Sequence, residues 1–113
     1  MLRFLIAALG ALALVPAATA AQPAADVRFA TFNASLNRSA AGQLVAHLTT
    51  TTNLQARNAA ETIQRIRPDV LLINEFDYDA TGAALRLFQD NYLSISQNGA
   101  QPISYPYRYA AES

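Results

Sequence analysis

The sequence predicts one small α/β domain, in which helices pack against a sheet. Two stretches, residues 27–33 and 69–75, are rich in the β-branched, aromatic and aliphatic residues that favour strands. Between them, the apolar residues of residues 54–67 recur at helical spacing. A strand, a helix and a second strand in succession are typical of layered α/β domains.

The first predicted strand, residues 27–33, alternates its side chains between two faces, with Phe29 and Thr31 on the same face. We expect Asn33 to end this strand. Gly, Ser, Asn and four consecutive threonines follow in residues 34–53. This composition indicates a long loop, with only a short turn around residues 44–48.

The clearest helix covers residues 54–67. Its apolar face consists of Ala56, Ala59, Ala60, Ile63 and Ile66. Thr52 or Asn53 is placed to cap its start, and Pro68 ends it. Glu61 and Arg65 are spaced for an ion pair on the exposed face.

The second predicted strand, residues 69–75, contains the unbroken apolar run Val70-Leu71-Leu72-Ile73 and is expected to be the most buried strand. Asn74 and Glu75 follow this run directly. A carboxylate is costly to bury without a cationic partner. We therefore expect Glu75 either to reach water at the strand end or to meet a metal ion or an arginine there.

The remaining elements are a second helix, a turn and a third strand. The helix is expected at residues 83–91, with Leu85, Phe88 and Tyr92 on its apolar face. The sequence QNGAQP, residues 97–102, has turn chemistry. Residues 103–113 are expected to begin a third strand.

The amino terminus has the three parts of a secretory signal peptide: Arg3, the apolar residues 4–15, and the small-residue site Ala18-Thr19-Ala20. The apolar stretch is shorter than the roughly 20 residues of a membrane-spanning helix. We expect residues 1–20 to be a cleaved signal peptide and residues 21–26 a linker before residues 27–113. The mature protein is then secreted or periplasmic, without stable membrane association.

Composition gives no support to several classes of function. The formal net charge is zero, unlike the basic footprint of a nucleic-acid-binding surface. Cysteine is absent, which excludes a thiolate metal site, a cysteine nucleophile and disulfides. The single histidine, His47, leaves no plausible serine-hydrolase triad. A short exported chain without disulfides has a small core, so we expect it to be one piece of a longer domain.

The remaining candidate site lies at the two strand ends. If the strands are parallel neighbours, Asn33 and Glu75 emerge at one edge of the sheet, where ligands of α/β proteins collect. Magnesium prefers oxygen ligands and often takes only one or two carboxylates, with water and substrate phosphate. The alternative is that Asn33 merely ends a strand and Glu75 merely reaches water.

The motifs and their order favour the first interpretation. ATFNASLNR followed by QARNAAETIQRIRPDVLLINEFD resembles the endonuclease/exonuclease/phosphatase superfamily of deoxyribonuclease-like hydrolases. Members open with a strand ending in Thr-x-Asn, here at Asn33. A helix ending near Pro-Asp follows, here Pro68-Asp69, and then a strand ending in a metal-binding glutamate, here Glu75. NYLSISQNGAQPISYPYRY is similar to a secreted bacterial branch, and the match covers nearly all of residues 27–109.

The resemblance implies a four-layer α/β/β/α sandwich, of which this chain supplies three strands and two helices. It implies magnesium-dependent hydrolysis of a phosphodiester or phosphomonoester, with manganese or calcium as alternative ions. Glu75 is then the metal ligand, and Asn33 is the catalytic residue that orients phosphate or completes the metal shell. Tyr105, Tyr107 and Arg108 either line a substrate cleft or, for the tyrosines, pack in the core.

Two departures limit what the resemblance implies. Asn74 stands where the family commonly has glutamine, and the histidine and aspartate motifs of the family's downstream half have no counterpart here. His47 is in the wrong place to replace them. We expect the N-terminal part of a secreted phosphoesterase, inactive alone, whose substrate is a nucleic acid or a small phosphate ester. The alternative is a small secreted non-catalytic binding domain or a degenerate remnant of such an enzyme.

The predicted signal peptide can be tested directly. N-terminal sequencing of the protein recovered from the periplasm or medium should begin at Ala21, because the Ala18-Thr19-Ala20 site directs cleavage after Ala20. A mature protein that still begins at Met1 would contradict the signal-peptide interpretation.

Overall fold

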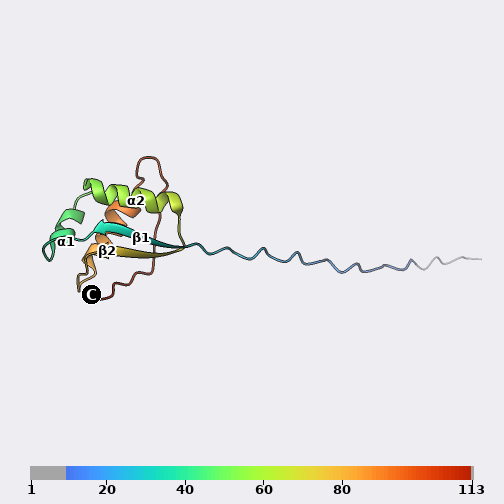
Figure 1. Ribbon diagram of the computed structural model, residues 1–113. Coiled ribbons are helices and arrows are strands. Elements are labelled where there is room, and N and C mark those ends of the chain that lie inside the picture. The colour runs from blue at the N-terminus through green and yellow to red at the C-terminus, as the bar shows by residue number, and fades with distance from the viewer. Residues whose placement is uncertain (1–9, 113) are drawn as a thin grey trace, which may run out of the picture.

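Two parallel strands and the helices that cover one of their faces make up the folded body (Figure 1). The computed structural model describes residues 10–112. The elements in chain order are β1 (Phe29–Leu36), α1 (Gln43–Leu48), α2 (Leu54–Ile66), β2 (Val70–Phe76), α3 (Ala83–Phe88) and a π-helical turn, η1 (Gln89–Leu93). The predicted α/β organisation is therefore confirmed at this level.

Residues 10–25 form no helix or strand and extend away from the body (Figure 1). Part of the predicted signal peptide, residues 1–9, lies outside the described residues. Across the part of the chain that the structure covers, no helix combines the length and apolar character needed to cross a membrane.

The two strands are parallel neighbours, which is the condition under which Asn33 and Glu75 emerge at one edge of the sheet. Phe29 of β1 pairs with Val70 of β2, and the register continues to Asn33 opposite Asn74. Helices α1 and α2 form the crossover between the strands. The chain thus returns to the amino end of the sheet before β2 begins.

The register shifts at the carboxyl end of the sheet. Ala34 and Ser35 of β1 together lie opposite Glu75 of β2, before Leu36 pairs with Phe76. Two residues facing one is the arrangement of a β-bulge. The prediction that Asn33 ends the first strand is therefore wrong, because the bulge lets β1 continue to Leu36.

One face of the sheet is covered and the other is open. Ala34 and Leu36 are buried under the helices, whereas Phe29 and Leu72 on the opposite face are 72% and 58% exposed. The prediction that residues 69–75 form the most buried strand is wrong, because the apolar run is continuous but its side chains alternate between a covered and an open face. The described residues contain this single sheet, with helices on one face.

Helix α2 agrees closely with the sequence-based prediction. Asn53 caps its start, its side-chain oxygen accepting from the backbone N–H of Ala56 at 3.0 Å. The helix ends at Ile66, followed by Arg67 in the left-handed conformation and then Pro68. The predicted pair forms as well, with Arg65 and Glu61 2.8 Å apart (nitrogen to oxygen).

The second predicted helix divides into α3 and the π-helical turn η1. Phe88, Gln89, Tyr92 and Leu93 are all buried, whereas Leu85 is only half-buried.

The predicted third strand is wrong: residues 103–112 contain no regular element. Pro102 and Pro106 lack a backbone N–H and cannot donate to a strand ladder. Ile103 and Tyr105 instead pack against the core.

The fully buried side chain of Gln64 connects α2 to the segment after η1. Its amide nitrogen donates to the carbonyls of Leu93 and Ile95, at 3.0 and 2.7 Å, and lies 3.3 Å from that of Tyr92. Its oxygen accepts from the backbone N–H of Gln97 at 3.0 Å. Gln64 thus bonds to backbone groups of a segment that forms no regular strand or helix, among them the Ile95 carbonyl and the Gln97 N–H.

Replacement of the Gln64 amide should lower the stability of the fold. We expect Gln64→Leu to lower the free energy of unfolding by about 2–4 kcal/mol, because the Ile95 carbonyl and the Gln97 backbone N–H lose their partner and the Tyr92 and Leu93 carbonyls lose one of theirs. The exposed Gln43 on α1 is the matched control, and Gln43→Leu should change stability by less than about 0.5 kcal/mol. Urea unfolding of the three proteins measures both values, and equal effects would contradict the assigned role of Gln64.

Candidate functional site

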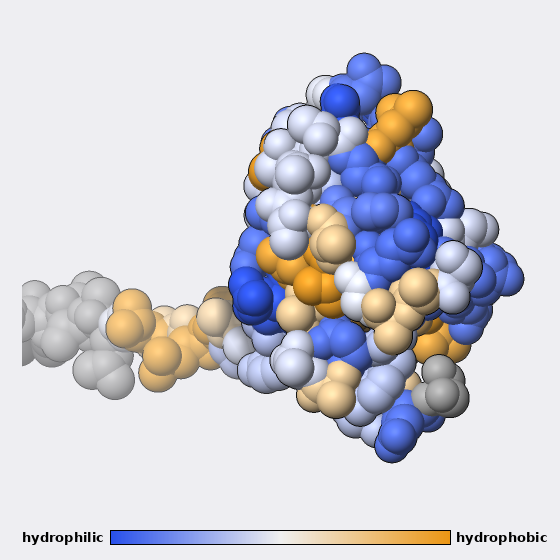
Figure 2. All heavy atoms as spheres, turned by 90° about the vertical axis from the view of Figure 1, so that its left-hand side faces the viewer, coloured by the Kyte–Doolittle hydropathy of each residue, from blue (hydrophilic) through white to orange (hydrophobic). Residues whose placement is uncertain are grey.

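Both sequence-predicted site residues lie at the carboxyl end of the parallel sheet. Asn33 pairs in register with Asn74, the residue before Glu75. Parallel strands place their carboxyl ends at one edge, so the expected proximity of Asn33 and Glu75 along the sheet is present. Figure 2 shows this side of the molecule, where hydrophilic residues surround smaller hydrophobic areas.

Asn33 is exposed, and its amide oxygen is engaged locally. That oxygen accepts from the backbone N–H of Ser35 at 3.0 Å and lies 3.3 Å from the Ser35 hydroxyl. This contact supports Ser35 in its left-handed conformation, φ 51°. The amide nitrogen of Asn33 bonds to no described residue, which leaves Asn33 suited to donate to an anion.

Glu75 is exposed and has an unusual backbone conformation. Its φ is 53°, in the left-handed region that a residue with a side chain seldom adopts. Its carboxylate makes no hydrogen bond and no ion pair with the residues that the structure describes. A strained residue at a strand end, with a free carboxylate, is the type of feature from which a functional role is inferred.

A second set of polar contacts lies just beyond the strands. The backbone N–H of Arg38 donates to the carboxylate of Asp77 at 2.9 Å, which ties the two strand exits together. The Arg38 Nε–H donates to Nδ1 of His47 on α1, also at 2.9 Å. Sequence reasoning did not assign this set.

The residues at this edge suit a magnesium ion held largely by water and substrate. Within residues 10–112, no three side chains of His, Cys, Asp or Glu come together as a metal-binding group. Glu75 offers one unengaged carboxylate, whereas the Asp77 carboxylate accepts from Arg38. One or two carboxylates with water and phosphate oxygens is a usual magnesium shell.

Tyr105 and Arg108 lie away from this edge. The Tyr105 hydroxyl donates to the carbonyl of Pro68 at 2.8 Å, at the amino end of β2. Burial raises the pKa of the Tyr105 phenol. Arg108 donates to the Tyr105 carbonyl, and Tyr107 is almost fully exposed. Tyr105 therefore packs in the core, and none of these contacts places a residue beside Glu75.

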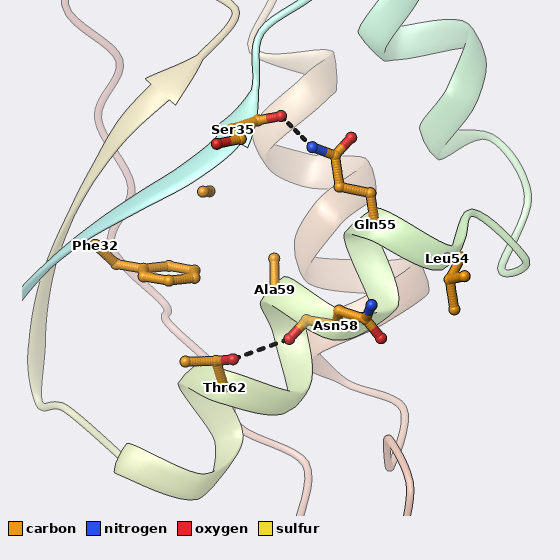
Figure 3. Close-up of a pocket in the computed structure, with 8 residues that line it drawn as sticks. Phe32, Ser35, Leu54, Gln55, Asn58, Ala59 and Thr62 are labelled. Atoms are coloured by element: carbon orange, nitrogen blue, oxygen red, sulfur yellow. Dashed lines mark hydrogen bonds between the residues drawn. The ribbon is translucent and has the colours of Figure 1, made fainter.

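An open groove of about 540 Å³ lies between β1 and α2 (Figure 3). Phe32 points from β1 toward α2, and Ala59 lies at the centre of the groove. Gln55, Asn58 and Thr62 supply polar groups along α2, and Gln55 donates to the carbonyl of Ser35. Their spacing on one helical face was the sequence signal for this groove, which sequence reasoning missed.

The loop after β2 is organised by Asp79. Its carboxylate accepts from the backbone N–H groups of Thr81, Ala83 and Ala84, at 3.1, 3.0 and 2.8 Å, and from the Thr81 hydroxyl. The hydrogen bond from the Thr81 hydroxyl, and to a smaller extent those from the three N–H groups, hold the pKa of the Asp79 carboxyl below its usual value. Asp79 thereby fixes the start of α3.

No protein-family model, no curated protein and no solved structure matches the chain. The chemistry of the sheet edge, with two amide side chains and one free carboxylate, is thus the basis for a functional assignment.

The lowered pKa of Asp79 gives stability a definite pH dependence. A carboxyl whose pKa is lower in the folded state stabilises the fold above its unfolded pKa of about 4, and this contribution is lost as pH falls through the folded pKa. We expect Asp79→Ala to cost about 1 kcal/mol at pH 7 and markedly less at pH 2. Urea unfolding at both pH values measures this, with Asp90→Ala on the exposed helix surface as control. A cost that is equal at the two pH values would contradict the assignment.

Proposed function

We propose that this chain supplies the metal-binding carboxylate and the phosphate-orienting amide of an exported, magnesium-dependent phosphoesterase. One observation carries the proposal: parallel pairing brings Asn33 and Glu75 to the same carboxyl edge of the sheet. The strained backbone and unengaged carboxylate of Glu75 support it. The resemblance to the endonuclease/exonuclease/phosphatase superfamily assigns roles to the same two residues.

In this proposal Glu75 holds the magnesium ion, or manganese or calcium in its place. A bound divalent ion neutralises charge on phosphoryl oxygens and on the leaving oxygen. Asn33 donates from its amide nitrogen to a non-bridging phosphate oxygen, because its amide oxygen is engaged by Ser35. Asn74, opposite Asn33 in the register, adds a second exposed amide on the same face.

The proposal assigns no turnover to this chain by itself. Phosphoester hydrolysis also needs a group that activates water. His47 accepts from Arg38 through Nδ1, and Asp77 accepts from the Arg38 backbone. We therefore assign water activation to a further part of the enzyme, as the superfamily resemblance implies.

The open face of the sheet supports the sandwich that the resemblance implies. Phe29, Val70 and Leu72 lie on this face with roughly half or more of their surface exposed. Apolar side chains that gather on one sheet face are normally covered by a second layer. In the proposed four-layer arrangement, a second sheet packs here and the helices remain outside.

A second candidate, a secreted non-catalytic binding domain, is favoured by the groove between β1 and α2. Its apolar centre and polar rim are typical features of a binding surface. The two candidates differ at Glu75, because a domain that binds through this groove does not need that carboxylate.

Magnesium titration therefore tests the proposal. The backbone amide NMR signals of residues 74–76 should shift saturably with magnesium, and Glu75→Gln should abolish the response because it removes the free carboxylate. Glu61→Gln on α2 is the matched control and should keep the response. In the complete phosphoesterase, Glu75→Gln should lower turnover by orders of magnitude and Asn33→Ala by less. An unchanged magnesium response in Glu75→Gln would favour the binding domain.

The assay of residues 21–113 alone completes this test. With magnesium or manganese, we expect no hydrolysis of plasmid DNA or of a bis-aryl phosphodiester. Metal-dependent turnover that Glu75→Gln abolishes would show that the chain carries its own water-activating group.

A further inference from the structure

One arginine lies at the same sheet edge and has no part in the function proposed above. Arg38 follows the end of β1 by two residues, and Asp77 follows the end of β2 directly. The hydrogen bond from the Arg38 backbone N–H to the Asp77 carboxylate holds the two exits together. The backbone of Arg38 is thereby fixed beyond the strand ends that carry Asn33 and Glu75.

The side chain of Arg38 is also held in place. Its Nε–H donates to Nδ1 of His47 at 2.9 Å, and Nη1 donates to the carbonyl of Asn37 at 2.8 Å. Because Nδ1 accepts, this contact requires the neutral imidazole with its proton on Nε2. The second terminal nitrogen, Nη2, bonds to no described residue.

The charge of Arg38 is not neutralised by a carboxylate. The ion pairs within the described residues join Arg65 to Glu61 and Arg86 to Asp90, both along helices. Arg28 likewise lacks an ion pair, but it lies at the amino end of the sheet and donates to a backbone carbonyl. An arginine that is partly buried as a residue, with an engaged Nε and an Nη2 that bonds to no described residue, is suited to an anion. Arginine matches phosphate geometry particularly well.

We propose that Arg38 binds a non-bridging phosphate oxygen of the substrate at this sheet edge. His47, as the neutral imidazole, is a positioning residue that directs the guanidinium through its Nε–H. The inference rests on the proposed phosphoesterase function for its ligand class, a phosphate ester anion. It needs no metal ion, because the attraction is between guanidinium and phosphate.

Phosphate titration of the isotope-labelled chain, without metal, tests the assignment. Inorganic phosphate represents a monoester-like dianion and dimethyl phosphate a diester. We expect the Arg38 Nε–H and the backbone amides of Asn37 and Arg38 to shift saturably with at least one of them, and the tighter ligand identifies the ester class. Arg38→Gln should weaken this binding by about tenfold or more, and Arg38→Lys by less. Arg86→Gln, on the exposed face of α3, is the matched control and should bind as the wild type does.

Two variants of His47 test its positioning role. His47→Gln keeps an acceptor for the Arg38 Nε–H and should retain phosphate binding, whereas His47→Leu removes the acceptor and should weaken it. Equal affinities in these two variants would overturn the positioning role. Binding that Arg38→Gln and Arg38→Lys leave unchanged, or no response to either ligand, would overturn the proposal itself.

These experiments distinguish a failure of the magnesium site at Glu75 from a failure of the phosphate site at Arg38. If Glu75→Gln leaves the magnesium response intact while Arg38→Gln removes phosphate binding, the metal assignment fails and the Arg38 site remains. If Glu75→Gln removes the magnesium response while Arg38→Gln binds phosphate normally, the Arg38 site fails and the phosphoesterase proposal remains.

Discussion

The fully buried Tyr92 joins the parts of the chain that hold the sheet in place. Its hydroxyl donates to the carbonyl of Thr50 and accepts from the backbone N–H of Asn53, in the loop that leads into α2. Its carbonyl lies 3.3 Å from the side-chain nitrogen of Gln64, and its ring stacks on Phe88 with 6.0 Å between centroids. These contacts fix the crossover between β1 and β2. The parallel register, and with it the candidate site, depends on that crossover.

Local signals made part of the fold predictable. Asn53 and Pro68 bound α2 because capping and the missing proline N–H act within a single turn. The apolar run of residues 70–73 has no period, so it identified a strand but not which face is covered. The left-handed conformations at Ser35 and Glu75 arise from the bulged pairing of two strands, which no single stretch of sequence encodes.

The candidate site was likewise only partly predictable from the sequence. Asn33 and Glu75 were identified because each follows a strand pattern directly, and parallel neighbours bring such positions together. Arg38 and His47 were not connected, because the loop and α1 that separate them have weak patterns. Tyr105 has a strand-like setting in the sequence, but the prolines on either side of Ile103 and Tyr105 leave it to pack against the core. Long-range hydrogen bonds, from Arg38 to Asp77 and from Tyr105 to Pro68, decided the positions of Arg38 and Tyr105.

The parallel pairing of β1 with β2 also governs when the body can form during synthesis. Phe29 must meet Val70, and loop closure over such a separation is costly until the contacts that reward it exist. A chain that emerges amino end first therefore has β1 without a partner until β2 has emerged. Tyr92, which fixes the crossover, emerges later still. The amino-terminal half is then accessible to chaperones until β2 has emerged.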